Sequence, residues 1–520
     1  MSEELKMKFY SNRSPKKGYS WETPPEPIAE ADIAETVTTE VLILGGGISG
    51  LASGARCADM GLQVIVLDKN KNLFALAGQI AAVNSRIMER EGVPPVDKKI
   101  LAADWMKMSG SRVQEELLWI FINRSAEGFH WMLDLAGEEN LDVGVYEAYK
   151  GPVFQEYPCT HHIFQKKGVH KYKQWWGGWL ACDILQTELL DQGGQVIRDT
   201  TALYLEKDET GRVTGCVAKC SDGAYRRYQG TKAVVVACGD CCENEEMLEA
   251  FCPIGARTKD RYSRPGNTGD GQKMLYWAGA AIDNMEWAPT IHTLSGTGYQ
   301  GFFLHVNQQG NRFMNEDTWM QAKSVRVLMQ PGGEWAYSIL DSKFADEIGE
   351  RFGELGGQGM MPLSLVGESY DRAKMIETVE KWIENGNAFV ADTIEELAEK
   401  IGVPAENLKA TVDRYNEIVA SGDDTDFGKR SRLLTSVEQG PFYALKWGPK
   451  LLDVFGGALV NKNLNVIDPD AQPIPGLYAV GNCAGGMYHV DYPLLLNGNS
   501  YGRALAYACQ LGDVLTGKLL

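Results

Sequence analysis

A glycine-rich turn at residues 45–50 has the composition and spacing of a dinucleotide-binding site. The turn reads Gly-Gly-Gly-Ile-Ser-Gly, which fits the pattern G-x-G-x-x-G. In this pattern Gly45 permits a tight turn, Gly47 lets the backbone approach a pyrophosphate, and Gly50 lets strand and helix pack closely. Asp68 follows the turn by about 20 residues, at the position of a carboxylate that binds a ribose hydroxyl. Together these features predict a nucleotide cofactor.

The elements on either side of this turn are those that a nucleotide site requires. The apolar run at residues 41–44 predicts a buried strand, the residues after the turn predict a helix, and residues 62–68 predict a second strand of a βαβ unit. The N-terminus of such a helix faces the negative charge of the phosphates. No second G-x-G-x-x-G match joins a predicted strand to a predicted helix, so we expect one resident cofactor. The predicted contacts in this region are Gly45, Gly47, Ser49, Gly50, Asp68 and Lys69.

Five further motifs occur in order along the chain. They lie at residues 237–244, 266–271 (Gly-Asn-Thr-Gly-Asp-Gly), 310–316 (Gly-Asn-Arg-Phe-Met-Asn-Glu), 424–428 and 473–482. With the N-terminal turn, they make the sequence resemble the flavoprotein subunit of the fumarate reductase and succinate dehydrogenase family. Within that family it resembles the soluble branch that includes ketosteroid dehydrogenases. The resemblance extends from about Glu40 to the C-terminus.

The resemblance implies that the cofactor is FAD. Membrane-bound members of the family attach the flavin through a histidine just before the position of Gly78 and Gln79. This chain has no histidine between residues 68 and 90, so we expect a non-covalent FAD. The further FAD contacts that the resemblance implies are Gly78, Gln79, Gly239, Asp270, Gly481, Asn482 and Ser500.

The resemblance also implies the architecture. We expect a mixed α/β (α+β) fold, in which a Rossmann-like FAD-binding domain contains an inserted clamp, or capping, domain that closes over the flavin. The predicted divisions are an N-terminal extension at 1–38, the first part of the FAD-binding domain at 39–284, the clamp domain at 285–452 and the second part of the FAD-binding domain at 453–520. Within the clamp, the sequence Thr-Ile-Glu-Glu at residues 393–396 predicts the start of a helix.

The substrate-binding positions of the family carry different residues in this chain. Fumarate reductases deliver a proton through an arginine, and the matching position, counted from the Asn-Glu dipeptide at 315–316, holds Met320. A second arginine, which binds a substrate carboxylate, is replaced by Tyr492, and a histidine is replaced by Asp453, whereas His292 matches a family histidine. Without the two guanidinium groups, a dicarboxylate would lose its bidentate contacts.

Tyr492 resembles a tyrosine of the ketosteroid dehydrogenases that donates a hydrogen bond to a substrate carbonyl. A phenol is a neutral donor and suits a neutral oxygen. Those enzymes carry their catalytic base tyrosine at the position of Met320, so here the proton must pass through another group. The predicted catalytic residues are Tyr492, His292, Asp317 and Tyr299, with Asp453 as a further candidate by location. A purely structural hydrogen bond is the alternative interpretation of each proton-transfer candidate.

These residues predict an FAD-dependent oxidoreductase that reduces, or forms, a carbon–carbon double bond next to a carbonyl in a neutral ring compound such as a steroid or flavonoid. Aromatic residues at 172–179, Trp287 and Trp319 fit either a flat apolar pocket or the core. Reduction requires an external electron donor. Three alternatives stay open: reductive removal of a ring substituent from an isoflavonoid, as in tetrahydrodaidzein reductases; a fumarate-type dicarboxylate reductase; and a non-catalytic flavin electron carrier.

The composition limits the remaining classes of function. A net charge of -18 argues against nucleic acid as a partner, because phosphate binding needs a positive face. No apolar stretch reaches the roughly 18 residues of a membrane helix, so we expect a cytoplasmic protein without a membrane span. The 11 cysteines are expected to be reduced thiols. The spacing of Cys238, Cys241, Cys242 and Cys252 matches no iron–sulfur ligand run, and no metal is predicted.

Overall fold

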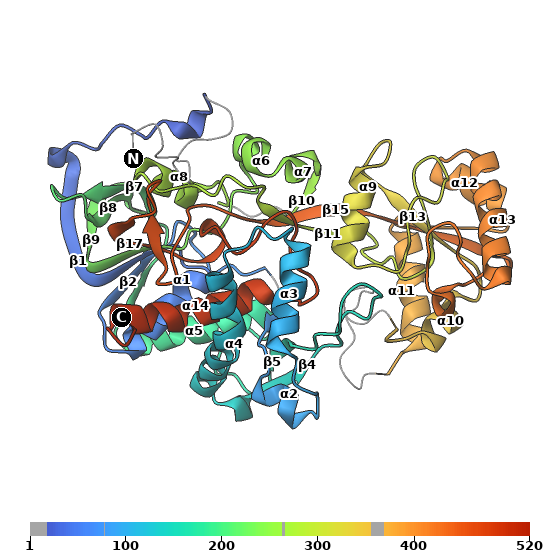
Figure 1. Ribbon diagram of the computed structural model, residues 1–520, viewed down its shortest axis with the longest axis horizontal. Coiled ribbons are helices and arrows are strands. Elements are labelled where there is room, and N and C mark those ends of the chain that lie inside the picture. Colours follow the sequence, from blue (N-terminus) through green and yellow to red (C-terminus); the bar gives the residue numbers. More distant parts are fainter. Residues whose placement is uncertain (1–17, 77, 263–265, 355–368, 520) are drawn as a thin grey trace, which may run out of the picture.

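The protein is built from two lobes that lie side by side. The computed structural model describes residues 18–76, 78–262, 266–354 and 369–519. Figure 1 shows a larger lobe, which holds the first strand and the last helix of the chain, and a smaller lobe beside it. The long strands β11 (Ala288–Gly296) and β15 (Phe442–Phe455) pair antiparallel and link the two lobes.

A largely parallel sheet forms the centre of the larger lobe. Its strand order is β16-β17-β9-β1-β2-β6, with β7 and β8 added beside β9. Strand β1 pairs in parallel with β2 and β9, and its residues 41–44 are buried, as expected for a strand in the middle of a covered parallel sheet. The strands are β1 (Ile33–Leu44), β2 (Val64–Leu67), β6 (Gln195–Ile197), β7 (Thr201–Lys207), β8 (Val213–Lys219), β9 (Tyr225–Val236), β16 (Asn465–Ile467) and β17 (Pro473–Ala479).

Helices cover this sheet, and a small antiparallel sheet completes the larger lobe. The helices α1, α4, α5 and α14 pack against one another below the sheet in the view of Figure 1. The small sheet has the order β3-β5-β4, with β3 (Ile80–Ala81), β4 (Leu141–Val145) and β5 (Thr160–Gln165). The helices are α1 (Ile48–Asp59), α2 (Arg86–Arg90), α3 (Lys98–Met108), α4 (Glu115–Ala136), α5 (Gly177–Asp191), α6 (Glu245–Phe251), α7 (Pro253–Arg257), α8 (Asp270–Trp277) and α14 (Asn499–Leu515).

The smaller lobe has its own sheet and its own cores. Strand β15 is central, because β10 (Asp260–Arg261), β11, β13 (Ala336–Leu340) and β14 (Ala388–Ala391) all pair with it, and β12 (Leu304–Val306) pairs with β13. Thr393 caps α12 by accepting a hydrogen bond from the Glu396 amide at 3.1 Å, which confirms the predicted helix start. The helices are α9 (Met320–Leu328), α10 (Phe344–Glu350), α11 (Arg372–Glu384), α12 (Ile394–Ile401) and α13 (Ala405–Ser421).

The first strand begins earlier than the sequence predicted. Residues 33–38 were placed in the N-terminal extension, yet they belong to β1 and pair with β9 from Ile33 opposite Tyr225. These residues show little apolar alternation because most of them are exposed. Their backbone pairing with β9, rather than burial of their side chains, keeps them in the sheet. Upstream, Trp21 is buried against Phe251 and Tyr276. Residues 1–17 of the predicted extension lie outside the described residues, and the domain divisions stay predictions.

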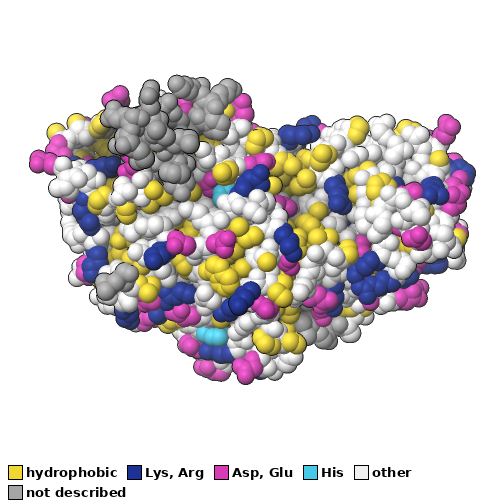
Figure 2. All heavy atoms as spheres, viewed as in Figure 1, with side chains coloured by type: hydrophobic (Ala, Val, Ile, Leu, Met, Phe, Trp, Pro, Cys, Tyr) yellow, Lys and Arg dark blue, Asp and Glu magenta, His cyan; other side chains and the backbone are white. Residues whose placement is uncertain are grey.

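The surface carries charges of both signs. On the face shown in Figure 2, Lys and Arg side chains are interspersed with Asp and Glu side chains. None of the helices among the described residues combines the length and the apolar character that a bilayer crossing needs.

Candidate active site

The glycine turn connects β1 to α1, as the sequence predicted. Gly45 has a φ of +111°, which favours glycine, and a Cβ there would lie 2.2 Å from the carbonyl oxygen of Ala237. A Cβ on Gly50 would lie 1.8 Å from the carbonyl oxygen of Gly45. At Gly47, no atom lies within 4 Å of the Cβ position. Gly45 and Gly50 therefore allow close packing, while Gly47 leaves its backbone accessible at the N-terminus of α1.

Asp68 follows β2 and lies against the glycine turn. Its carboxylate accepts hydrogen bonds from the backbone amides of Gly46 at 3.1 Å and Asn70 at 2.8 Å, and from Arg198 at 3.1 Å. Burial raises the pKa of the Asp68 carboxyl above its usual value, and the amides and Arg198 oppose that effect. The carboxylate is thus fixed beside the turn, where it can accept a hydrogen bond from a ribose hydroxyl.

A cleft with an empty volume of about 1190 Å³, part of it open to solvent, runs past this turn. Its wall combines the ends of parallel strands with turns from distant parts of the sequence. The predicted cofactor residues that line it are Gly45, Gly47, Ser49, Asp68, Lys69, Gly239, Asp270, Asn482 and Ser500. Lys69 and Asp270, which are far apart in sequence, form an ion pair at 2.5 Å on this wall.

Four predicted cofactor residues lie just behind the cleft wall. Gly50 packs on Gly45, and a Cβ on Gly481 would lie 2.6 Å from the Ser49 hydroxyl oxygen. A Cβ on Gly78 would lie 2.2 Å from the ring of Trp176, and the backbone of Gln79 lies against Gly498. Their direct contact with a cofactor stays a prediction.

The cleft fits the groups that make up FAD. The open backbone at Gly47 and the N-terminus of α1 suit a pyrophosphate, and Asp68 suits a ribose. Asp453 of β15 and the start of α14 also line the cleft, so it extends beyond the glycine turn. A parallel sheet with this turn, this carboxylate and this cleft defines a dinucleotide-binding protein of the Rossmann type.

Comparison with known proteins shows which family of dinucleotide-binding proteins this chain belongs to. Residues 40–500 match the family model described as an FAD binding domain, and the chain belongs to this family. The protein is an FAD-dependent oxidoreductase. It is 28% identical to a probable fumarate reductase of Shewanella frigidimarina, over 98% of this chain and 80% of that protein. It is 25% identical to vinyl phenol reductase of Lactiplantibacillus plantarum, over 92% of this chain and 94% of that protein.

The fold is shared with a solved structure of a steroid-binding enzyme. The structure of 3-ketosteroid-Δ4-(5α)-dehydrogenase from Rhodococcus jostii in complex with 4-androstene-3,17-dione superposes with a TM-score of 0.73 at 23% identity. The match covers 94% of this chain and 99% of that one.

Tyr492 lies beside the cleft wall in an aromatic stack. Its ring stacks on Phe455 at 4.8 Å between centroids, and its hydroxyl oxygen accepts a hydrogen bond from the backbone amide of Ser500 at 3.1 Å. Ser500 lines the cleft. Burial raises the pKa of Tyr492 to about 12, so the phenol stays protonated at neutral pH. Both the backbone amide and the side chain of Ser500 interact with the phenol, whose proton can be donated to an acceptor.

His292 and Asp453 lie on the paired strands β11 and β15, and of the two only Asp453 lines the cleft. Asp453, on β15, lines the cleft and accepts a hydrogen bond from the Asn482 side chain at 3.2 Å. The Nε2 atom of His292, on β11, is buried and has no hydrogen-bond partner among the described residues. Burial lowers the pKa of His292 to about 4, and the charge of Asp453 opposes this effect. At neutral pH the imidazole is therefore uncharged.

Asp317 and Tyr299 lie in the smaller lobe. The Asp317 side chain is fully buried and forms a double hydrogen bond with the Arg430 guanidinium, one arm of it at 2.6 Å. Tyr299 is buried in an aromatic core, with its ring stacked on Trp382. Like Tyr492 and His292, neither residue lines the cleft, and the catalytic roles of all four stay predictions.

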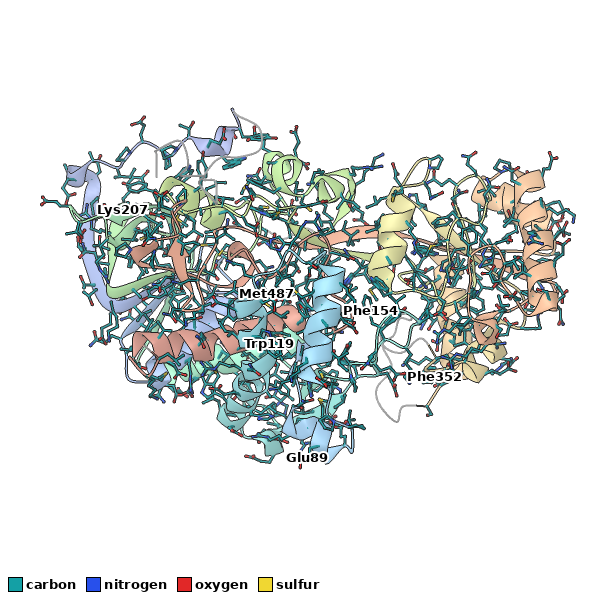
Figure 3. All side chains as sticks on the ribbon, in the orientation of Figure 1. Glu89, Trp119, Phe154, Lys207, Phe352 and Met487 are labelled. Atoms are coloured by element: carbon teal, nitrogen blue, oxygen red, sulfur yellow. The ribbon has the colours of Figure 1, made fainter. Side chains whose placement is uncertain are left out.

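Aromatic side chains from both lobes meet where the lobes join. Phe154, on the loop between β4 and β5, lies at this junction in Figure 3. Its ring and that of Tyr149 lie 5.7 Å from the ring of Trp319, which caps α9. Met320 follows as the first helical residue and is buried, so the position of the family's proton-delivering arginine carries an apolar thioether.

Two residues at the site were not predicted from the sequence. Arg503, on α14, is buried and donates a hydrogen bond to the Asn482 side chain at 3.2 Å. Asp491 precedes Tyr492, and burial raises the pKa of its carboxyl to about 7, with the Gln321 side chain and the Tyr492 amide opposing. No sequence signal reveals either, because the property that distinguishes them is burial. The 11 cysteines, all within the described ranges, carry free thiols.

Proposed function

We propose that this protein uses FAD to reduce a carbon–carbon double bond next to a carbonyl group in a neutral cyclic substrate such as a steroid or flavonoid. The proposal depends on the hydroxyl of Tyr492. Its oxygen is hydrogen-bonded by the amide of Ser500, which lines the cleft, and its proton would be donated to a substrate oxygen.

The charges at the site favour a neutral substrate over a dicarboxylate. The two positions that hold arginines in the fumarate reductases carry Met320 and Tyr492, neither of which can pair with a carboxylate. Arg503 does not replace them, because its side chain is 1% exposed and covered by aromatic rings. Two of the similar proteins are named for vinyl phenol and a ketosteroid, which are both uncharged molecules.

The residues can divide the chemistry among them. When bound, FAD supplies hydride transfer to or from a substrate carbon. Tyr492 would hold the carbonyl oxygen and draw electron density from the adjoining double bond. The second hydrogen would arrive as a proton from a titratable group, for which Asp453 on the cleft wall, His292 on the neighbouring strand and Asp491 beside Tyr492 are candidates. The aromatic junction around Trp319 would exclude water, and an external donor would supply the electrons.

The experiment is anaerobic turnover with reduced methyl viologen as the electron donor, followed by mass analysis of the product. We expect cyclic enones or flavonoids to gain two hydrogens at the double bond. Loss of a ring hydroxyl from an isoflavonoid, without saturation of the ring, would instead identify reductive removal of a substituent. Conversion of fumarate to succinate, with every enone unchanged, would contradict the proposal.

A further inference from the structure

The most unusual charge in the larger lobe belongs to Arg503. Its guanidinium lies 4.6 Å from the ring centre of Tyr488, 5.7 Å from that of Phe455 and 5.8 Å from that of Tyr507. Its Nη2 donates to Asn482, whereas Nε and Nη1 are buried without a hydrogen-bond partner among the described residues. No carboxylate in the described part of the chain forms an ion pair with it. Buried arginines are normally paired, so this one carries an uncompensated charge.

This charge is placed where the fold itself disfavours it. Arg503 lies within the first two turns of α14, near the positive end of the helix dipole, which repels a cation. Removal from water adds a further cost of several kcal/mol per ion. An apolar side chain such as methionine would fill the space between the rings without either cost. A residue that is costly for stability at this position points to a role in function.

The Arg503 guanidinium is connected to the cleft wall through Asn482. Asn482, which accepts the hydrogen bond from Arg503, lines the cleft and donates to Asp453 on the same wall. Ser500, whose amide is at the N-terminus of α14, also lines it. The glycine turn and Asp68 account for the phosphate and adenosine side of the cofactor, which leaves the wall around Asn482 for the flavin half. Charge–charge interactions are strong in such a buried environment.

We propose that Arg503 raises the reduction potential of the bound FAD. Addition of two electrons and one proton to oxidised flavin leaves one extra negative charge on it, and a buried cation across Asn482 stabilises that form. The inference depends on FAD binding alone and goes beyond the choice of substrate. A raised potential would make the bound FAD easier for an external donor to reduce, and would lower the driving force of the later hydride transfer to substrate.

The test is the midpoint potential of the FAD-loaded protein, measured by equilibrium with a reference dye, in Arg503→Met and Arg503→Lys. We expect Arg503→Met to lower the two-electron equilibrium constant for reduction about a hundredfold, which is a fall of about 60 mV. Arg503→Lys keeps the charge and should retain most of the wild-type potential. Arg124→Gln is the matched control, because Arg124 contacts Gln510 and Asp513 near the other end of α14 and is paired with carboxylates. Its potential should equal that of the wild type.

Equal potentials in the wild type, Arg503→Met and Arg503→Lys would overturn the inference. If Arg503→Met does not retain FAD, the midpoint potentials of Arg503→Gln and Arg503→Lys are compared instead. The potential of Arg503→Gln should again be lower than that of Arg503→Lys. A potential that falls equally in the lysine and glutamine variants would assign the effect to packing rather than charge, and would also overturn it. Because no substrate enters the measurement, its result is independent of whether any enone is reduced.

Discussion

The hydroxyl oxygen of Tyr492 lies 3.1 Å from the backbone nitrogen of Ser500 and accepts its hydrogen bond. The amide comes from the first turn of α14 and would otherwise have no intrahelical partner. Tyr492 therefore satisfies this amide at the helix end with a lone pair of its oxygen, next to Ser500, which lines the cleft. This relationship makes the tyrosine suited to hold a carbonyl oxygen in a fixed position.

Tyr492→Phe should reduce turnover of an enone substrate about 10²- to 10³-fold, the usual effect of removing one donor to a developing oxyanion. FAD content should stay close to the wild type, because the ring and its stacking on Phe455 remain. The measurements are kcat/KM under anaerobic conditions and flavin absorbance per protein. Tyr488→Phe is the matched control, since its hydroxyl is committed to Asn499 at 2.8 Å, and it should have a smaller effect. Parallel loss of FAD and turnover in Tyr492→Phe would make this tyrosine structural.

Asp68→Asn should weaken FAD binding. The substitution removes the negative charge of the carboxylate that accepts hydrogen bonds from the Gly46 and Asn70 amides. Each hydrogen bond to a charged group contributes about 1.5–3 kcal/mol. The dissociation constant should rise about 10- to 100-fold. Titration of the apoprotein with FAD, followed by flavin fluorescence, measures it. Asp413→Asn, in the smaller lobe, removes a carboxylate that pairs with Lys409 on the surface and should leave the affinity unchanged. An unaltered affinity in Asp68→Asn would show that this carboxylate does not bind the cofactor.

The partly buried imidazole of His292, whose Nε2 atom is buried, should make stability depend on pH. Its folded-state pKa of about 4 is below the unfolded value of about 6.5, so the folded state resists protonation. The contribution to stability is complete above pH 6.5 and is lost as the pH falls toward 4. Between pH 7 and pH 5, His292→Gln should lose about 2 kcal/mol less unfolding free energy than the wild type. Urea unfolding at both pH values measures the two free energies. Equal losses of unfolding free energy in the variant and the wild type would show that the imidazole is exposed to water in the folded protein.

Asp317→Asn should lower stability rather than act on the chemical step. The carboxylate is fully buried, and its removal leaves the Arg430 guanidinium without its charged partner. We expect a loss of about 3 kcal/mol, the order found when one member of a buried ion pair is removed. Thermal unfolding and kcat per bound FAD are the two readouts. Unchanged stability with abolished turnover would support Asp317 as the proton donor, one of the candidates that the sequence predicts.

The nucleotide site could be predicted because its geometry is local. Gly45, Gly47 and Asp68 belong to one βαβ unit, in which the turn and the strand end are fixed by a short stretch of chain. The substrate side depends on contacts between distant segments. The sequence could not show that Asp317 is paired with Arg430, that Tyr299 is enclosed in an aromatic core, or that Asn482 joins Arg503 to Asp453. Arg503 reads in the sequence as an ordinary charged residue of a helix, because burial and the absence of a partner are tertiary properties.

The central claim is that reduced FAD in this protein passes its electrons to a neutral, carbonyl-activated double bond. The most direct measurement reduces the protein anaerobically with dithionite and follows reoxidation of the flavin absorbance after mixing with a cyclic enone, an isoflavonoid or fumarate. We predict that the enone or the isoflavonoid reoxidises the flavin faster than fumarate at equal concentration. Fumarate as the fastest acceptor would contradict the claim, and the same slow reoxidation with all three would favour an electron carrier without substrate turnover.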